Sequence, residues 1–179
     1  LQAQGHQRVM LAGHSLGAVK SIFTQATDPV ADLAGVIALS PPRLCHEAQV
    51  DSVNGKRFVE TYERARELAA SGRGDDLFAA VVPIPAIFAA AQYVKKYGPE
   101  NRYDLARHFP NVACPALLVL GTKEARDLVS IGATAALVED LQKSVRDLSV
   151  RMFEGADHAY TGMIDDVCAA LIEWLREVE

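Results

Sequence analysis

Four short apolar runs along the chain predict buried β-strands, at residues 8–12, 35–39, 116–120 and 148–153. Each run ends at a glycine or at turn-forming residues. The first three do not alternate with polar residues, which is typical of parallel strands covered on both faces. Segments with helical spacing of apolar residues follow them, including 17–26 and the C-terminal stretch 163–179. Strands that alternate with helices predict an α/β fold with a doubly wound, mostly parallel sheet.

The long segment between the second and third predicted strands, residues 43–112, has a different pattern. One predicted helix carries an apolar face made of Phe58, Tyr62 and Ala65. A second helix is predicted over 86–96, and no strand is predicted. We therefore expect a helical cap or lid inserted into a core that is formed by residues 1–42 and 113–179.

Within that insert, residues 77–91 form an unbroken apolar run. The run is too short for a membrane span, and Pro83 and Pro85 interrupt it. It is expected to be buried or to line a pocket for an acyl chain, with Phe88 as a candidate pocket residue.

Composition and charge narrow the classes of partner. The 179 residues carry a net charge of −5 and contain no block of lysine and arginine, which disfavours nucleic acids and anionic membranes as partners. Three cysteines, far apart and without a C-x-x-C pair, favour neither a disulfide framework nor a zinc site. No signal peptide is visible, and a cytoplasmic location without metal or cofactor is expected.

A nucleophile candidate lies directly after the first predicted strand. Residues 13–17 read Gly-His-Ser-Leu-Gly, a G-x-S-x-G pattern with a strand before it and a helix after it. In such a strand–turn–helix elbow the serine, here Ser15, is exposed at a tight turn, and Gly13 and Gly17 avoid a collision with the backbone. The N–H of Leu16 would face a developing oxyanion at the start of the helix. The alternative is a glycine-rich turn whose serine only caps a helix.

A serine hydroxyl needs a base that removes its proton, and His158 is the candidate. It follows the last predicted strand, so it lies at the same carboxyl edge of the sheet as Ser15, where catalytic groups of α/β folds collect. The alternative for His158 is a surface or capping histidine. His14 is part of the elbow, but its side chain is expected to point away from the serine and is a candidate pocket residue.

An acid is needed to hold the tautomer of the base. Glu124 is the first carboxylate after the third predicted strand, again at the carboxyl edge. Asp127 lies three residues later and is the alternative. Asp157 adjoins His158, but neighbouring side chains rarely face each other in a productive way.

The order of serine, acid and histidine resembles that of the α/β-hydrolases. The resemblance covers nearly the whole chain, from the elbow at Gly13 to the closing helix, and the insert lies where that family often places a lid. It implies a Ser15–His158–Glu124 triad, although the glutamate replaces a commoner aspartate. The family has several strands before the elbow, where a loop supplies the second oxyanion donor. Since the chain starts at Leu1, we expect it to be the C-terminal portion of a longer protein, poorly soluble and nearly inactive alone.

These expectations favour a serine esterase that acts on a small or medium acyl substrate, a small molecule, through an acyl-enzyme. Thioesterase or amidase activity at the same site is the first alternative. A malonyl-type acyltransferase also has a GHSLG elbow, but it lacks an acid turn like residues 121–124. A non-catalytic binding protein on a hydrolase scaffold is an alternative from another class, and an intact triad argues against it. The sequence does not indicate the oligomeric state.

Overall fold

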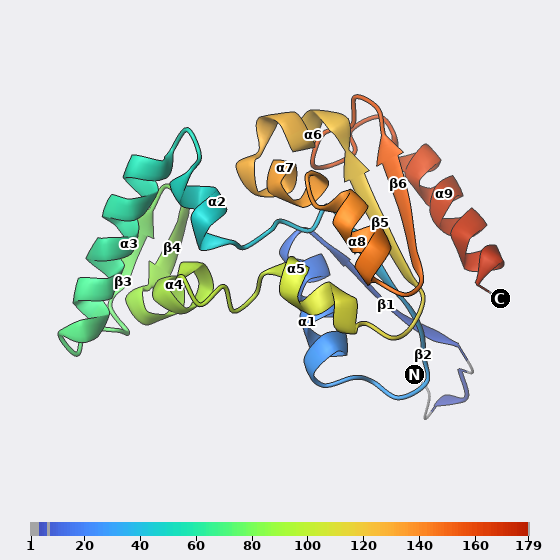
Figure 1. Cartoon of the computed structure of the whole chain (residues 1–179), viewed down its shortest axis with the longest axis horizontal. Helices are drawn as coiled ribbons and strands as arrows, with labels where there is room; N and C mark the ends of the chain where they lie inside the picture. Colours follow the sequence, from blue (N-terminus) through green and yellow to red (C-terminus); the bar gives the residue numbers. More distant parts are fainter. Residues whose placement is uncertain (1–3, 7, 179) are drawn as a thin grey trace. The chain divides into compact units, whose positions relative to one another are not determined.

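A computed structural model of the chain describes residues 4–6 and 8–178 (Figure 1). The chain divides into two compact units. The first, called the sheet unit, combines Leu1–Arg43 with Leu105–Glu179, and the second, called the insert unit, is Leu44–Asp104.

The sheet unit is built on four parallel strands in the order β1-β2-β5-β6. Their bounds are β1 Val9–His14, β2 Leu33–Leu39, β5 Ala116–Gly121 and β6 Leu148–Phe153. All four strands that the apolar runs predict are present. The register pairs His14 with Leu39 and Gly121 with Phe153, so the carboxyl ends of the strands meet at one edge.

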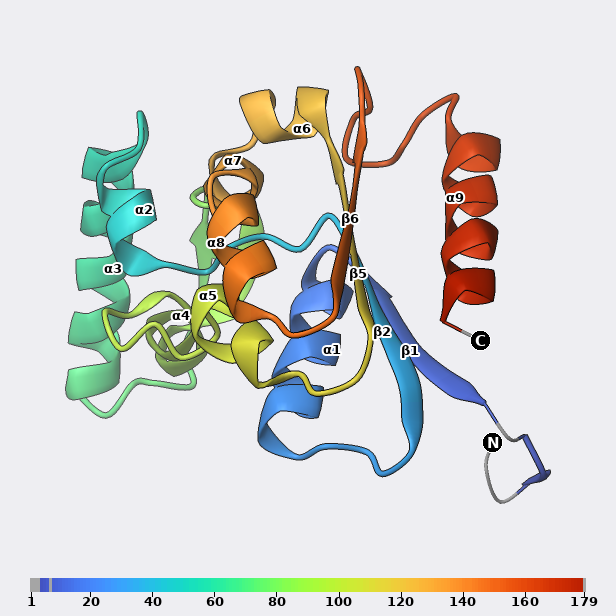
Figure 2. The same ribbon diagram turned by 45° about the vertical axis from the view of Figure 1, so that its right-hand side comes forward.

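Helices cover both faces of this sheet, and Figure 2 shows α9 on one face and α1 and α8 on the other. The helical elements of the sheet unit are α1 Leu16–Thr27, α5 Leu105–His108, η2 Phe109–Asn111, α6 Thr122–Asp127, α7 Val129–Ala135, α8 Val138–Ser144 and α9 Ile164–Glu177. Parallel strands joined by crossover helices require this three-layer arrangement, which confirms the predicted α/β class.

The two faces of β5 explain why its sequence lacks polar residues. Leu118 and Leu120 pack in one core cluster with Ile22 of α1, whereas Leu117 belongs to a second cluster with Trp174 of α9. Side chains alternate across a strand, so a strand covered on both faces needs apolar residues at every position.

The insert unit contains α2 His46–Val50, α3 Gly55–Ala70, β3 Leu77–Ala80, β4 Ala86–Ala89 and α4 Ala90–Tyr97. The helix expected from Phe58, Tyr62 and Ala65 is α3, and all three side chains are buried. The expectation of an insert without strands is wrong, because β3 and β4 form an antiparallel hairpin. Phe78 faces inward, whereas Leu77 and Ile87 on the other face are 73% and 72% exposed. Apolar residues on both faces hid the alternation that normally reveals a strand.

The insert is also shorter than expected. Residues 105–112 belong to the sheet unit, where Leu105 and Phe109 join the core beside α1. The action of the insert as a lid stays a prediction. Among the described residues, no helix is long and apolar enough to cross a membrane.

Candidate active site

Ser15 forms the turn between β1 and α1 by itself, since β1 ends at His14 and α1 begins at Leu16. Its backbone angles are φ 56° and ψ −124°, a conformation that indicates strain in a residue with a side chain. The N–H of Ser15 donates to the carbonyl oxygen of Leu39 at 2.8 Å, which ties the turn to β2. The elbow expected from the G-x-S-x-G pattern is therefore present as a local structure.

The two glycines of the motif play different parts. A Cβ atom on Gly13 would lie 2.3 Å from the carbonyl carbon of Gly17 and 2.5 Å from the nitrogen of Ala18, and backbone atoms cannot give way. Gly13 is thus required by the tightness of the turn. A Cβ atom on Gly17 would meet nothing within 4 Å in the described part of the chain, so the expectation of a collision there is wrong.

The helix α1 begins directly after Ser15. Ser15 is the N-cap residue, and its own carbonyl oxygen accepts the N–H groups of Ala18 and Val19. Leu16 is the first helical residue, so its N–H has no carbonyl of its own helix to bond. This N–H and the helix dipole favour negative charge beside Ser15.

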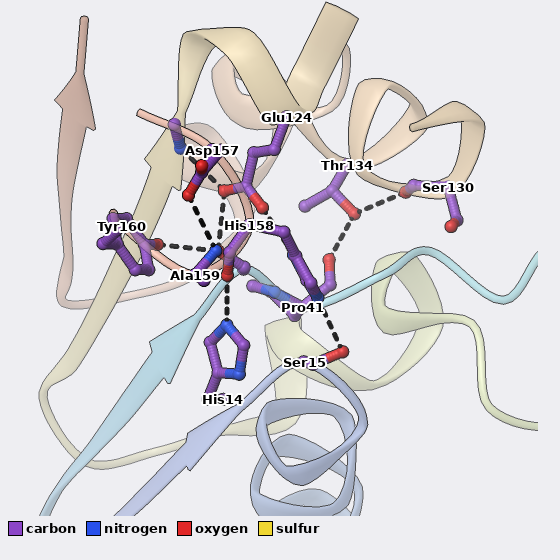
Figure 3. Close-up of polar contacts among 12 residues, drawn as sticks. His14, Ser15, Pro41, Glu124, Ser130, Thr134, Asp157, His158, Ala159 and Tyr160 are labelled. Atoms are coloured by element: carbon purple, nitrogen blue, oxygen red, sulfur yellow. Dashed lines mark hydrogen bonds and ion pairs between the residues drawn. The ribbon is translucent and has the colours of Figure 1, made fainter. Parts of the chain in front are cut away.

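His158 lies on the loop between β6 and α9, between two polar partners (Figure 3). Its Nε2 is 3.0 Å from Oγ of Ser15, and its Nδ1 is 2.6 Å from Oε2 of Glu124. The carboxylate accepts the proton on Nδ1, so Nε2 carries a lone pair toward the serine in the neutral imidazole. The side chain remains 35% exposed, which leaves it accessible from solvent.

The loop that carries His158 is held by the neighbouring carboxylate. Asp157 accepts the N–H of Ala159 at 3.1 Å and that of Thr161 at 3.0 Å. These bonds, that of Thr161 above all, hold the pKa of Asp157 below its usual range. Asp157 therefore fixes the shape of the loop, and the structure assigns it no bond to the imidazole.

Glu124 is the acid that the structure brings to His158. Only 1% of the residue is exposed, although it lies in the short helix α6 that follows β5. The main chain holds it, because its N–H donates to the carbonyl oxygen of Ala156 at 3.1 Å. A Cβ atom on Gly121 would lie 2.3 Å from that same oxygen, so the end of β5 and the histidine loop touch through their backbones. Gly121 also donates its N–H to Oε1 of Glu124 at 2.7 Å.

Asp127, the alternative acid, lies elsewhere. Its carboxylate is paired with Arg126 at 2.7 Å on the surface of α6. The hydrogen bond from that guanidinium holds the pKa of Asp127 below its usual range. The structure does not bring Asp127 to the imidazole.

The two candidate pocket residues have other neighbours. Nε2 of His14 is 2.7 Å from the carbonyl oxygen of His158, and the two rings lie 4.8 Å apart. A carbonyl oxygen only accepts, so Nε2 of His14 carries a proton, and the residue steadies the histidine loop. Phe88 packs inside the insert unit, with ring centroids 5.3 Å from Tyr93 and 6.1 Å from Tyr97.

Two residues that the sequence reasoning missed lie next to Glu124. Oγ of Ser40, at the end of β2, is 2.6 Å from Oε1 of Glu124. The hydroxyl of Tyr160, two residues after His158, is 2.7 Å from the same Oγ. Ser40 could have been found by its position at the carboxyl end of a strand, but nothing in the sequence pairs it with Tyr160.

This arrangement can move a proton between Ser15 and His158. The Ser15 hydroxyl can pass its proton to Nε2 of His158, and Glu124 stabilises the imidazolium that results. The deprotonated oxygen is then a nucleophile at the N-terminus of a helix. Among residues 4–6 and 8–178, no group of three or more His, Cys, Asp or Glu side chains is arranged to hold a metal ion.

Comparisons with known proteins agree with this fold. Residues 1–173 match the sequence model of the alpha/beta hydrolase family, whereas no curated protein matches the chain. Est1E from Butyrivibrio proteoclasticus has a TM-score of 0.60 at 18% identity, over 96% of this chain and 61% of Est1E. A monoacylglycerol lipase from Paleococcus ferrophilus has a TM-score of 0.67 at 19% identity, over 99% of this chain and 71% of the lipase. A proline iminopeptidase from Mycobacterium smegmatis has a TM-score of 0.54 at 17% identity, over 99% of this chain and 68% of the peptidase.

The chain thus spans less than two thirds of the length of Est1E, and at these identities the solved structures share its fold alone. The family model, in contrast, matches nearly the whole chain. The chain belongs to the alpha/beta hydrolase family.

Proposed function

We propose that this chain carries the nucleophile, base and acid of a serine hydrolase that cleaves ester-type bonds of small or medium acyl substrates. Ser15 is the nucleophile, His158 the general base and acid, and Glu124 the carboxylate that orients the base. The observation that carries the proposal is the unbroken hydrogen-bonded path from Oγ of Ser15 through both ring nitrogens of His158 to Oε2 of Glu124.

The reaction follows from that path in two halves. Oγ of Ser15 attacks the substrate carbonyl while His158 takes its proton, and His158 then protonates the leaving alcohol. Water attacks the acyl-enzyme with His158 again as base, and His158 returns that proton to Oγ of Ser15 as the bond between Oγ and the acyl group breaks, which releases the acid product. The N–H of Leu16 stabilises the oxyanion in both halves, and one such donor is worth about 10²–10³ in kcat.

A separate experiment is needed to identify the type of bond that is cleaved, because proteins of this fold cleave several types. The neighbours named above include a monoacylglycerol lipase and a proline iminopeptidase, so thioesterase or amidase activity at the same site is the alternative. An ester, a thioester and an anilide with the same acyl group distinguish these activities through kcat/KM. We expect the ester to be preferred over the anilide, because an alkoxide leaves more readily than an amide nitrogen.

Covalent labelling tests the triad without knowledge of the substrate. A fluorophosphonate probe is expected to label the full-length protein, and Ser15→Ala is expected to abolish both labelling and turnover, a loss of about 10⁶ in kcat. Ser144→Ala is the matched control, since Oγ of Ser144 donates within its own helix, to the carbonyl oxygens of Asp140 and Leu141. A full-length protein that is folded but takes no label would instead support a binding protein on a hydrolase scaffold.

A further inference from the structure

Two buried hydroxyl groups form a second hydrogen-bonded path that ends on the acid. Ser40 is fully buried and Tyr160 is 4% exposed. Oγ of Ser40 lies 2.6 Å from Oε1 of Glu124, and the Tyr160 hydroxyl lies 2.7 Å from Oγ of Ser40. The carboxylate therefore uses one oxygen for the imidazole and the other for this path.

The direction of every proton in the path follows from the distances. Oγ of Ser40 is too close to a carboxylate oxygen unless a proton lies between them, and an ionised carboxylate only accepts, so Ser40 donates to Glu124. Ser40 then has no second proton, so the proton between the two hydroxyls belongs to Tyr160. The carbonyl oxygen of Val119, 3.3 Å from the Tyr160 hydroxyl, is the weaker acceptor of that same proton. Burial, above all, raises the pKa of Tyr160, which keeps that proton in place.

Backbone strain gathers at the same residues. Among the described residues, five other than glycine have a positive φ, and three of them are Ser15, Ser40 and Tyr160. A positive φ is costly in residues other than glycine and persists where the surroundings hold it. The N–H of Ser40 donates to the carbonyl oxygen of Val119 at 2.8 Å, which holds this conformation at the end of β2.

We propose that Ser40, supported by Tyr160, is a positioning residue that holds Oε1 of Glu124 by a hydrogen bond and so aims Oε2 at Nδ1 of His158. The proposal rests on the proposed triad, which it extends by two residues. Without the Ser40 hydroxyl, the N–H of Gly121 is the one donor that the described residues still offer to Oε1. The buried negative charge is then less stabilised, and the Glu124–His158 pair takes up a proton more readily.

The expected signature is in the pH profile. The acidic limb of kcat/KM marks the pH at which the pair takes up that proton. The loss of one hydrogen bond to a charged group corresponds to a shift of about one to two pH units. Because the N–H of Gly121 still donates to Oε1, we expect the acidic limb to move by about one unit to higher pH. KM at the pH optimum is expected to stay unchanged, because the hydroxyl acts through Glu124 and not on the substrate.

Other titratable groups near the pair do not produce this shift. The ring of His14 lies 4.8 Å from that of His158, and its bond to a backbone carbonyl does not involve Ser40. The carboxylate of Asp157 is occupied by backbone N–H groups of its own loop, and Lys123 interacts with that carboxylate. Substitution of Ser40 leaves these three groups in place.

The experiment compares Ser40→Ala with a hydroxyl deletion that does not touch the acid. Thr134→Val is the matched control, since Thr134 is fully buried and its Oγ1 donates to the carbonyl oxygen of Pro41, next to Ser40 (Figure 3). The full-length protein is assayed with p-nitrophenyl acetate across pH, and the rate of fluorophosphonate labelling is measured in parallel. Both variants are expected to lower the unfolding temperature, but only Ser40→Ala is expected to move the acidic limb.

Tyr160→Phe provides a second measurement. It replaces Ser40→Ala as the test of the proposal in case Ser40→Ala does not fold. It keeps the ring and removes the proton donor to Ser40, so a shift in the same direction, but smaller, is expected. The double variant is expected to shift no further than Ser40→Ala alone, because Tyr160 acts through Ser40. A pH profile that is unchanged in both Ser40→Ala and Tyr160→Phe overturns the proposal. In that case, loss of labelling in Ser15→Ala still supports the triad. Labelling that survives in Ser15→Ala overturns the triad and this proposal with it.

Discussion

Replacement of Glu124 by Gln exchanges one carboxylate oxygen for an NH₂ group, and the structure dictates which one. The N–H of Gly121 points at Oε1 from 2.7 Å and cannot rotate, since it belongs to the backbone at the end of β5. An NH₂ group at the position of Oε1 would face another donor, so the amide oxygen of the glutamine must occupy that position. The NH₂ group then faces Nδ1 of His158, which lies 2.6 Å from the other oxygen in the native chain.

The imidazole has to change its tautomer in response. Nδ1 must accept from the NH₂ group, so the proton of the neutral ring moves to Nε2, which points at Oγ of Ser15. A protonated Nε2 cannot take the proton of the serine. A wrong tautomer of this kind costs about 10⁴ in kcat, which corresponds to about 5.5 kcal/mol of transition-state free energy.

The assay compares Glu124→Gln with Asp127→Asn, using p-nitrophenyl acetate and the unfolding temperature of each variant. Asp127 is paired with Arg126 on the surface, so its substitution is expected to change kcat by less than about two-fold. Equal losses in the two variants, or a larger loss in Asp127→Asn, would show that Glu124 is not the acid. A folded Glu124→Gln variant that retains more than about a tenth of native kcat would refute the tautomer argument.

Three further predictions concern the turn, the histidine loop and the insert. Gly13→Ala is expected to lower the unfolding temperature in calorimetry because its Cβ meets backbone at 2.3 Å, whereas Gly17→Ala has open space and is expected to stabilise α1 by about 0.5–1 kcal/mol; the reverse order would contradict the assigned turn. His14→Ala removes a donor from the loop of the base and is expected to lower kcat about two- to ten-fold with KM unchanged, and a change confined to KM would make His14 a substrate-pocket residue instead. Ile87→Ser is expected to lower kcat/KM for hexanoyl relative to acetyl esters by about ten-fold, and Val53→Ser, at a position of the insert unit that is 92% exposed against 72% for Ile87, is the control. Identical ratios in both variants would count against a role of the hairpin in acyl binding.

Much of the sheet unit could be predicted because its signal is local. An apolar run such as 116–120 bounded by glycine predicts a strand by itself, and the carboxyl-edge rule then brings Ser15, Glu124 and His158 to one edge. The hairpin of the insert was not predicted, because Leu77 and Phe78 are both apolar although they point to opposite faces. The sequence therefore shows no alternation of polar and apolar residues there. The first four residues of the expected helix 86–96 consequently form β4.

The rest of the site depends on contacts between distant segments. Ser40 is one of the turn-forming residues that end the second predicted strand, and the packing of β2 against β5 is what brings its hydroxyl to Glu124. The explanation for Gly17 was wrong for a similar reason, since a motif gives residue types and the space around each one is set by tertiary structure. Residues 105–112 were assigned to the insert because helical spacing does not show that Leu105 and Phe109 pack against α1.

The backbone contact between Gly121 and Ala156 joins the two turns that carry Glu124 and His158. It therefore bears on the order in which the parts of the proposed triad come apart when the protein unfolds. Glu124 and His158 are 34 residues apart along the chain, whereas Ser15 and His158 are 143 apart. The entropy lost on closing a loop grows with its length, so the carboxylate and imidazole meet at a smaller cost than the imidazole and the serine. Under mild urea, molecules that have released β1 can therefore keep a formed acid–base pair without a nucleophile. Hydrolysis should then disappear at lower urea than the circular dichroism of the helices does.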